Sequence, residues 1–148
     1  MSVALLDVNA LIALHWRPHI FHQAMMDWIV RNGSGGWATC SLTQAGFVRV
    51  LSNPSFDPNA PSPGNALALL KKSTESNPQH HFWTDTIPLT GISLSLRNRI
   101  QGHKQIPDAY LLAMSAHYRG TLVTFDSRMH SLAPKGSQEH AVLVVLRS

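Results

Sequence analysis

The chain of 148 residues is poor in cysteine, in acidic side chains and in long apolar runs. Its one cysteine, Cys40, excludes an internal disulfide, and with it the class of small secreted proteins that disulfides hold together. No segment approaches the roughly 20 consecutive apolar residues of a membrane span, and the first residues lack the basic region of a signal peptide. We therefore expect a cytoplasmic protein with no membrane segment.

Acidic residues are scarce, so their positions carry information. The chain has 8 Asp and Glu against 12 Lys and Arg, which gives a net charge of +4. Such a basic balance favours a polyanionic partner such as nucleic acid, although basic surfaces also occur in proteins that bind none. Asp7, Asp108 and Asp126 adjoin strongly apolar segments, whereas the other acids lie in polar or amphipathic surroundings.

Apolar periodicity and turn residues predict one domain over residues 1–148, in which strands alternate with helices. The predicted strands are 3–6, 37–40, 81–84, 122–125 and 141–146, and the predicted helices are 10–16, 18–31, 42–51, 66–73, 93–101 and 108–118. In these helices Pro18 opens the second, Asp108 caps the last, and Gly120 is placed to end it. The alternation predicts an α/β fold with a parallel central sheet flanked by helices.

The three aspartates are expected at one edge of this sheet. Asp7 and Asp126 each follow a strand, and Asp108 begins a helix, so all three can lie beyond the carboxyl ends of the strands, where α/β proteins form their sites. Each alone is explained as a helix cap or a turn residue. Together they repel one another unless a cation lies between them. Carboxylate oxygens suit Mg²⁺ or Mn²⁺, and such an ion can assist the hydrolysis of a phosphodiester.

Three segments resemble, in the same order, the motifs of the PIN domain, and the chain is similar to VapC-type ribonuclease toxins. They are LLDVNALIAL at 5–14, SLTQAGFVRVLSNP at 41–54 and IPDAYLLAMSAHYRGTLVTFD at 106–126. The resemblance implies a PIN-like fold and a Mg²⁺-dependent endoribonuclease, with Mn²⁺ as a substitute, that acts on RNA as the toxin of a type II toxin–antitoxin pair. It implies that Asp7, Asp108 and Asp126 bind the metal, and that Asn9 supports them.

The resemblance also implies two protein partners, a cognate antitoxin and a second copy of the chain. The helices carry more aromatic and Met side chains than one small core needs, which independently favours a homodimer. We therefore expect a basic groove that leads to two sites.

Gln44 departs from the family pattern, because many relatives carry Glu at the position we match to it. A glutamine offers a carbonyl oxygen but no charge. We interpret Gln44 as a substitution within a working site, and therefore as a catalytic group beside the three aspartates. The alternative is a catalytically impaired PIN-like module that binds RNA or another partner without cutting.

Other polar residues near the predicted site have weaker assignments. Thr124 and Ser127 flank Asp126, where their hydroxyls can bond to groups around the metal or stabilise a turn. A basic stretch precedes Asp108, and it serves either as a grip on the RNA backbone or as a solvated surface. Its members, our candidates for RNA binding, are Arg97, Arg99, His103 and Lys104.

Two other chemistries fit the sequence less well. A phosphatase of the haloacid dehalogenase type also begins with a strand that ends in Asp. It needs a second Asp two residues later, where this chain has Asn9, and a lysine on a later strand, which is not evident. A zinc site on His15 and His19 requires both on one helix, and Pro18 between them argues against this.

Overall fold

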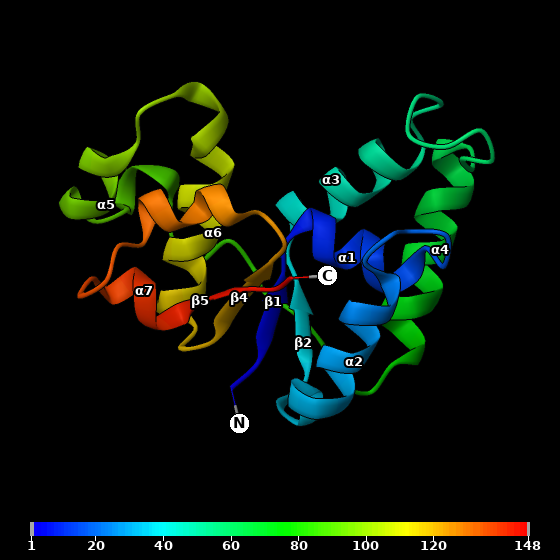
Figure 1. The fold of residues 1–148 in the computed structure, drawn as a ribbon, viewed down its shortest axis with the longest axis horizontal. Coiled ribbons are helices and arrows are strands. Elements are labelled where there is room, and N and C mark those ends of the chain that lie inside the picture. Colours follow the sequence, from blue (N-terminus) through cyan, green and yellow to red (C-terminus); the bar gives the residue numbers. More distant parts are fainter. Residues whose placement is uncertain (1, 148) are drawn as a thin grey trace.

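The computed structural model describes residues 2–147 and contains, within them, one five-stranded sheet surrounded by helices (Figure 1). The strands are β1 (Ala4–Leu6), β2 (Trp37–Thr39), β3 (His80–Phe82), β4 (Thr121–Thr124) and β5 (Leu143–Val145). The α-helices are α1 (Val8–His15), α2 (His22–Asn32), α3 (Ser41–Leu51), α4 (Pro63–Ser76), α5 (Leu94–Arg99), α6 (Ile106–His117) and α7 (Gln138–Val142). Short 3₁₀ helices are η1 (Gly33–Gly35), η2 (Leu89–Gly91), η3 (His103–Gln105) and η4 (Ser127–Leu132).

The sheet is parallel throughout and has the strand order β3-β2-β1-β4-β5, which confirms the predicted fold class. Its central strand, β1, pairs Leu5 with Ala38 of β2 on one side and with Leu122 of β4 on the other. The chain first builds outward from β1 to β2 and β3, and then crosses to β4 on the opposite side. The strand order therefore reverses between β1 and β4, which is where parallel α/β sheets form a crevice for ligands.

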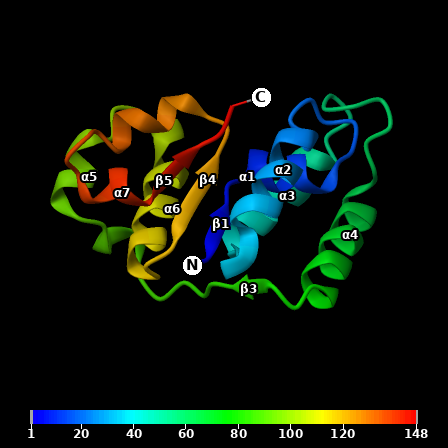
Figure 2. The ribbon, with the colours of Figure 1, turned by 60° about the horizontal axis from the view of Figure 1, so that its bottom comes forward.

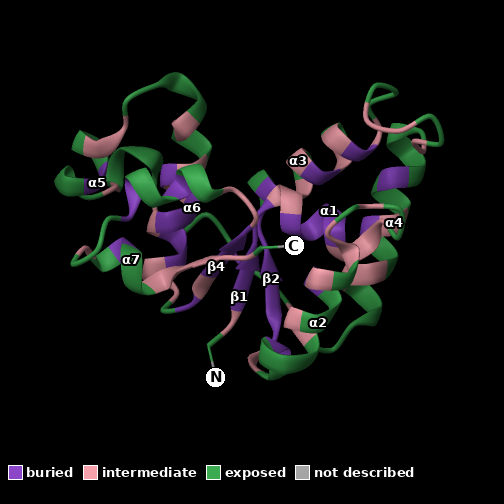
Figure 3. Cartoon of the chain, viewed as in Figure 1, coloured by how far each residue is buried: buried purple, intermediate pink, exposed green. Residues whose placement is uncertain are grey.

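Each face of the sheet has its own hydrophobic core, because successive side chains of a strand point to opposite faces. Leu6 packs in the core formed with α1, α2, α3 and α4, and Leu5 packs in the core formed with α5 and α6. Figure 2 shows these two groups of helices on either side of the sheet, and Figure 3 shows that the central strands β1, β2 and β4 are largely buried. No helix within residues 2–147 is both long and apolar enough to cross a bilayer.

Many of the bulky side chains that favoured a homodimer lie inside these cores. The buried ones on helices include Met25, Phe47 and Met114. They therefore fill the interior of one chain, and the homodimer remains a prediction that needs another basis.

Several predicted boundaries are wrong, and α4, for example, extends beyond the predicted 66–73 at both ends. Helix α2 begins at His22 and not at Pro18, because Pro18 lies in a turn in which the His19 N–H donates to the Trp16 carbonyl. Helix α6 begins at Ile106, so Asp108 is its third residue and not its cap. The segment predicted as a strand over 141–146 divides into the end of α7 and β5.

Gly120 has a different role from the predicted one. The residue with a left-handed backbone after α6 is Arg119, with φ of 56°, and the Gly120 N–H donates to the Ser115 carbonyl at 2.9 Å, as in a Schellman motif. Gly120 is needed for close packing, because a Cβ there would lie 2.5 Å from the Val3 carbonyl oxygen and 2.6 Å from the Trp83 ring.

We predict that Gly120→Ala lowers the free energy of unfolding by about 1–3 kcal/mol, the usual cost of overpacking. The matched control is Gly64→Ala in the first turn of α4, where a Cβ meets nothing within 4 Å. The control should leave stability unchanged or raise it by up to about 1 kcal/mol. Urea unfolding of the three proteins measures both effects, and equal midpoints for the two variants would contradict the prediction.

Candidate active site

Asp7 is the most enclosed carboxylate of the site. It follows β1 directly and is only 8% exposed. Its Oδ1 accepts a hydrogen bond from the Val8 N–H at 2.8 Å, which caps α1, and its Oδ2 accepts one from the Thr124 hydroxyl at 2.8 Å. Burial raises the pKa of Asp7, and these two hydrogen bonds act in the opposite direction.

Thr124, the last residue of β4, ties together the ends of the two central strands. Its buried hydroxyl donates to Asp7 and accepts from the Asp126 N–H at 3.1 Å and from the Asn9 side-chain amide at 3.1 Å. Asn9 in turn accepts a hydrogen bond from the Phe125 N–H at 3.1 Å. Thr124 and Asn9 therefore fix the position of Asp7 relative to the segment that carries Asp126.

Asp126 is held by an arginine two residues along the chain. The Arg128 guanidinium donates from Nε to Oδ1 at 2.9 Å and from Nη2 to Oδ2 at 3.0 Å, and the Arg128 backbone N–H donates to Oδ1 at 3.0 Å. These bonds lower the pKa of Asp126. The Arg128 side chain is 88% exposed, so its displacement from Asp126 disturbs no packing.

Asp108, in the first turn of α6, has no such partner. Within residues 2–147 its carboxylate accepts no hydrogen bond and forms no ion pair. Partial burial, and then the negative charges of Asp7 and Asp126, raise the pKa of Asp108 to about 6. The charge of Arg128 opposes this rise only in part, so the site retains excess negative charge.

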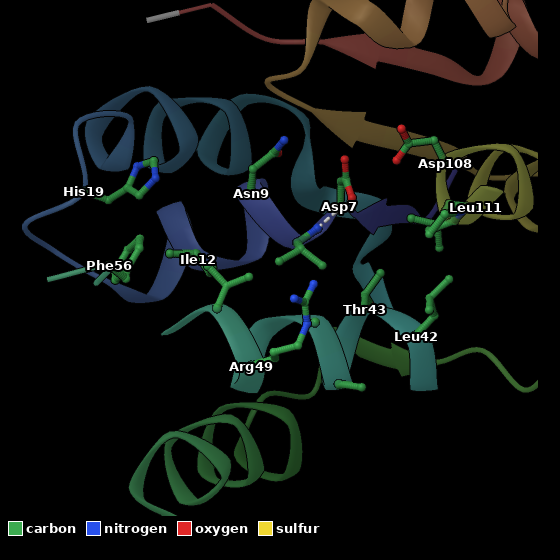
Figure 4. A pocket seen from close by; sticks show the side chains of 15 residues that line it. Asp7, Asn9, Ile12, His19, Leu42, Thr43, Arg49, Phe56, Asp108 and Leu111 are labelled. Carbon is green, nitrogen blue, oxygen red and sulfur yellow. Dashed lines mark hydrogen bonds between the residues drawn. The ribbon is translucent and has the colours of Figure 1, made fainter. Parts of the chain in front are cut away.

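A cavity of about 560 Å³ lies above Asp7 and Asp108, and Figure 4 shows the Asp108 carboxylate directed toward Asp7. From there the cavity extends between α1 and α3 to His19 and Phe56. Its other lining residues are Val8, Asn9, Ile12, Leu42, Thr43, Ala45, Gly46, Arg49, Val50, Pro107 and Leu111.

Gln44 is not where we expected it. It does not line this cavity, and its side-chain amide donates to the buried Thr39 hydroxyl at 3.0 Å. The Thr39 hydroxyl is also within 2.8 Å of a ring nitrogen of His80. The face of α3 that meets the cavity instead carries Thr43, Gly46 and Arg49, three residues apart and one face of a helix. That spacing was the signal in the sequence that could have identified Arg49.

The donor chemistry of the site fits Mg²⁺ or Mn²⁺. Asp7, Asp108 and Asp126 offer only oxygen atoms, which these hard cations prefer, and their mutual repulsion raises the affinity for a divalent cation. The carboxylates are not gathered into a finished metal site, because no three His, Cys, Asp or Glu side chains within residues 2–147 are placed to hold one ion. The three aspartates share the predicted edge of the sheet, but they are not yet placed to share one ion, and Asp126 is bound by Arg128 instead.

The other predicted residues lie outside the cavity. Arg99 pairs with the buried Glu139 at 3.0 Å and donates to the Leu132 carbonyl, so it joins α5 to η4 and α7 rather than binding RNA. Ser127 lines a different cavity, beside Phe21 and Phe125. Exposed positions on α5 and η3 hold the remaining candidates for RNA binding, which are Arg97, His103 and Lys104.

The histidines proposed for zinc are also occupied elsewhere. The His15 Nδ1 bonds to the Leu11 carbonyl at 2.8 Å, and the His19 Nδ1 accepts from the Phe21 N–H at 3.0 Å.

Comparison with known proteins decides the family. The model of the PIN domain matches residues 4–135, nearly the whole chain and all three aspartates. This chain belongs to the PIN domain family. The assignment leaves the haloacid-dehalogenase alternative without support, in agreement with Asn9 in place of the acid that such an enzyme requires.

Similar PIN proteins include two from Mycobacterium tuberculosis strain H37Rv. Ribonuclease VapC39 is 42% identical over 136 residues, which cover 92% of this chain and 97% of that protein. Ribonuclease VapC44 is 40% identical over 138 residues, which cover 93% and 96%. A crystal structure of VapBC2 from Rickettsia felis, bound to a DNA fragment from their promoter, contains a chain of the same fold. It aligns with a TM-score of 0.61 over 98% of this chain and 99% of that chain, at 12% identity.

We predict that the Asp108 carboxylate destabilises the metal-free PIN domain at neutral pH. With a folded pKa near 6 and an unfolded pKa of about 4, the folded chain binds more protons between these values, so its stability falls as pH rises through that window. At pH 7.5, Asp108→Asn should therefore have a higher free energy of unfolding than the wild type, and a higher urea midpoint. The gain should be on the order of 1 kcal/mol, because the group is half-exposed and screened by solvent. At pH 4 the difference should vanish.

The same experiment with Mg²⁺ provides the control. A cation bound by the folded state should stabilise the wild type and have less effect on Asp108→Asn. Parallel pH profiles for the two proteins in EDTA would contradict the charge repulsion assigned to Asp108.

Proposed function

We propose that this chain is an endoribonuclease, the toxin of a type II toxin–antitoxin pair, that hydrolyses RNA phosphodiester bonds with a divalent cation. One observation carries the proposal. Asp7 and Asp108 line the same cavity at the carboxyl edge of the sheet, and burial, together with the charges of Asp7 and Asp126, raises the pKa of Asp108. A cluster of carboxylates with excess negative charge is a poor binding site for RNA unless it first binds a cation.

The comparisons support this proposal in a second way. VapC39 and VapC44 carry the name ribonuclease, and both align over more than nine-tenths of this chain. The VapBC complex from Rickettsia felis supports an antitoxin as the protein partner. A site in the cytoplasm, where RNA and such a partner occur together, completes the proposal.

In this proposal Asp7, Asp108 and Asp126 hold Mg²⁺, with Mn²⁺ as a substitute. The cation would supply activation of a water molecule and stabilisation of the charge that develops on the phosphodiester. Thr124 and Asn9 hold Asp7 in a fixed orientation, so little reorganisation is needed when the substrate binds. Because the Arg128 side chain is exposed, its displacement would free the Asp126 oxygens that it now contacts for the cation.

The alternative, an impaired module that binds RNA or another partner, depended on lost chemistry at Gln44. Because Gln44 bonds to Thr39 and lies outside the cavity, its missing charge is not a defect of the carboxylate cluster. An active nuclease is therefore the better proposal.

We predict that Asp7→Asn and Asp108→Asn each reduce RNA cleavage by about 10²–10³-fold, since each removes a charge that holds the cation. Gln44→Ala, the control, should cut RNA within a few-fold of the wild type, provided that its fold is intact by circular dichroism. Cleavage of total RNA with Mg²⁺, and growth arrest of a bacterial host on induction, are the measurements. A Gln44→Ala protein as inactive as Asp108→Asn would make Gln44 a catalytic group after all.

We also propose a homodimer, now on a surface of α3, η2 and α6. An apolar groove there includes the large exposed side chains Leu42, Leu89 and Ile106. Burial of such side chains on a second copy is favourable. Light scattering should give twice the mass of one chain at micromolar concentration. Leu89→Lys should lower this mass, and a single-chain mass for the wild type without antitoxin would exclude the dimer.

A further inference from the structure

The long cavity changes character along its length. At one end lie Asp7 and Asp108, which need a cation. At the other end lie His19 and Phe56, and Arg49 enters the cavity from α3 between the two ends. A polyanion whose reacting phosphate lies at the carboxylates would therefore extend towards a positively charged wall.

Arg49 reaches this cavity because α3 packs closely on α1. Gly46 makes the close approach possible, since a Cβ there would lie only 2.5 Å from the Val8 Cγ2 atom. Arg49 follows one turn later on the same face of α3, and Figure 4 shows its side chain entering the cavity from that helix. The packing of two helices therefore sets the position of the guanidinium.

The Arg49 guanidinium is free to bind a ligand. Within residues 2–147 it forms no ion pair and donates no side-chain hydrogen bond, although two carboxylates line the same cavity. Arg99 and Arg128, by contrast, are bound to Glu139 and Asp126. A guanidinium without a carboxylate partner in a cavity of about 560 Å³ is suited to a phosphate, which it can bind through two parallel hydrogen bonds.

His19 adds a second hydrogen-bond donor to the cavity, on the side away from the carboxylates. Because the Phe21 N–H donates to its Nδ1, the neutral ring carries its proton on Nε2. Phe56 contributes an aromatic face and itself packs against Trp16, with ring centroids 6.5 Å apart. Hydrogen-bond donors beside an aromatic ring are typical of proteins that bind single-stranded nucleic acid.

We propose that Arg49 is a substrate-positioning residue that binds an RNA phosphate next to the scissile one, in a subsite between α1 and α3. This inference rests on the proposed nuclease function and deepens it by naming where the RNA strand continues beyond the carboxylates. The subsite selects a single strand, because its donors and aromatic wall reach a phosphate with an unpaired base attached.

The test measures binding separately from cleavage. A fluorescein-labelled RNA 12-mer of random sequence is titrated with each protein at several salt concentrations. Ca²⁺ replaces Mg²⁺ throughout, because without a bound cation the carboxylates repel RNA. Arg49→Gln should weaken binding by about tenfold and reduce the slope of log K against log salt by about 0.7, the contribution of one phosphate contact on a single strand. Arg49→Lys should retain the slope, because it retains the charge. The matched control is Arg31→Gln on α2, an exposed arginine outside this cavity, which should change neither quantity.

A change in fold alone would not alter the salt slope by one contact and restore it in the lysine variant. Equal affinity and slope for wild type and Arg49→Gln, or no binding of this RNA by the wild type, would overturn the subsite.

Cleavage in Mg²⁺ is then scored for the same proteins. If RNA binds through Arg49 and none is cut, the nuclease proposal fails and the subsite stands. If RNA is cut and Arg49→Gln has an unchanged KM, the subsite fails and the nuclease stands.

Discussion

The hydrogen bond from Thr124 to Asp7 is the interaction on which the site depends. It joins the ends of β1 and β4, the two strands between which the strand order of the sheet reverses. A buried carboxylate is costly unless it is hydrogen-bonded, and here the neighbouring strand and the first N–H of α1 supply the bonds. The same threonine accepts from the Asp126 N–H, so one hydroxyl aligns both segments.

The remaining electrostatics follow from this arrangement. Partial burial raises the pKa of Asp108, and the charge of Asp7, which is held only by neutral donors, raises it further. The pKa of Asp126 is lowered instead, because Arg128 donates hydrogen bonds to its carboxylate. The folded chain therefore retains carboxylates that repel one another at the edge of its sheet. Such strain is typical of functional sites, since a core built for stability alone would use apolar groups there.

The cavity extends this asymmetry to the scale of a bound strand. Its acidic end requires a cation, and Arg49 supplies a positive charge on the adjoining wall, so both suit a phosphate backbone. Gly46 makes this position of Arg49 possible. Because it has no side chain, α3 packs closely on α1 and Arg49 reaches the cavity wall. The close contact between Gly46 and Val8 thereby determines which side chain of α3 lines the cavity.

The sequence by itself determined the fold class and the position of the three aspartates at one edge of the sheet. Strands alternating with helices require a parallel sheet, and carboxylates after β1 and β4 must share the edge where parallel strands end. The tertiary structure alone decided which side chains of the helices face the cavity. One residue turns a helix by about 100°, so the side-chain direction of Gln44 depends on how α3 packs on Val8, a contact between segments far apart in the chain. Local sequence likewise could not assign Arg99 to a buried Glu139, because that pair forms only when α5 and α7 meet.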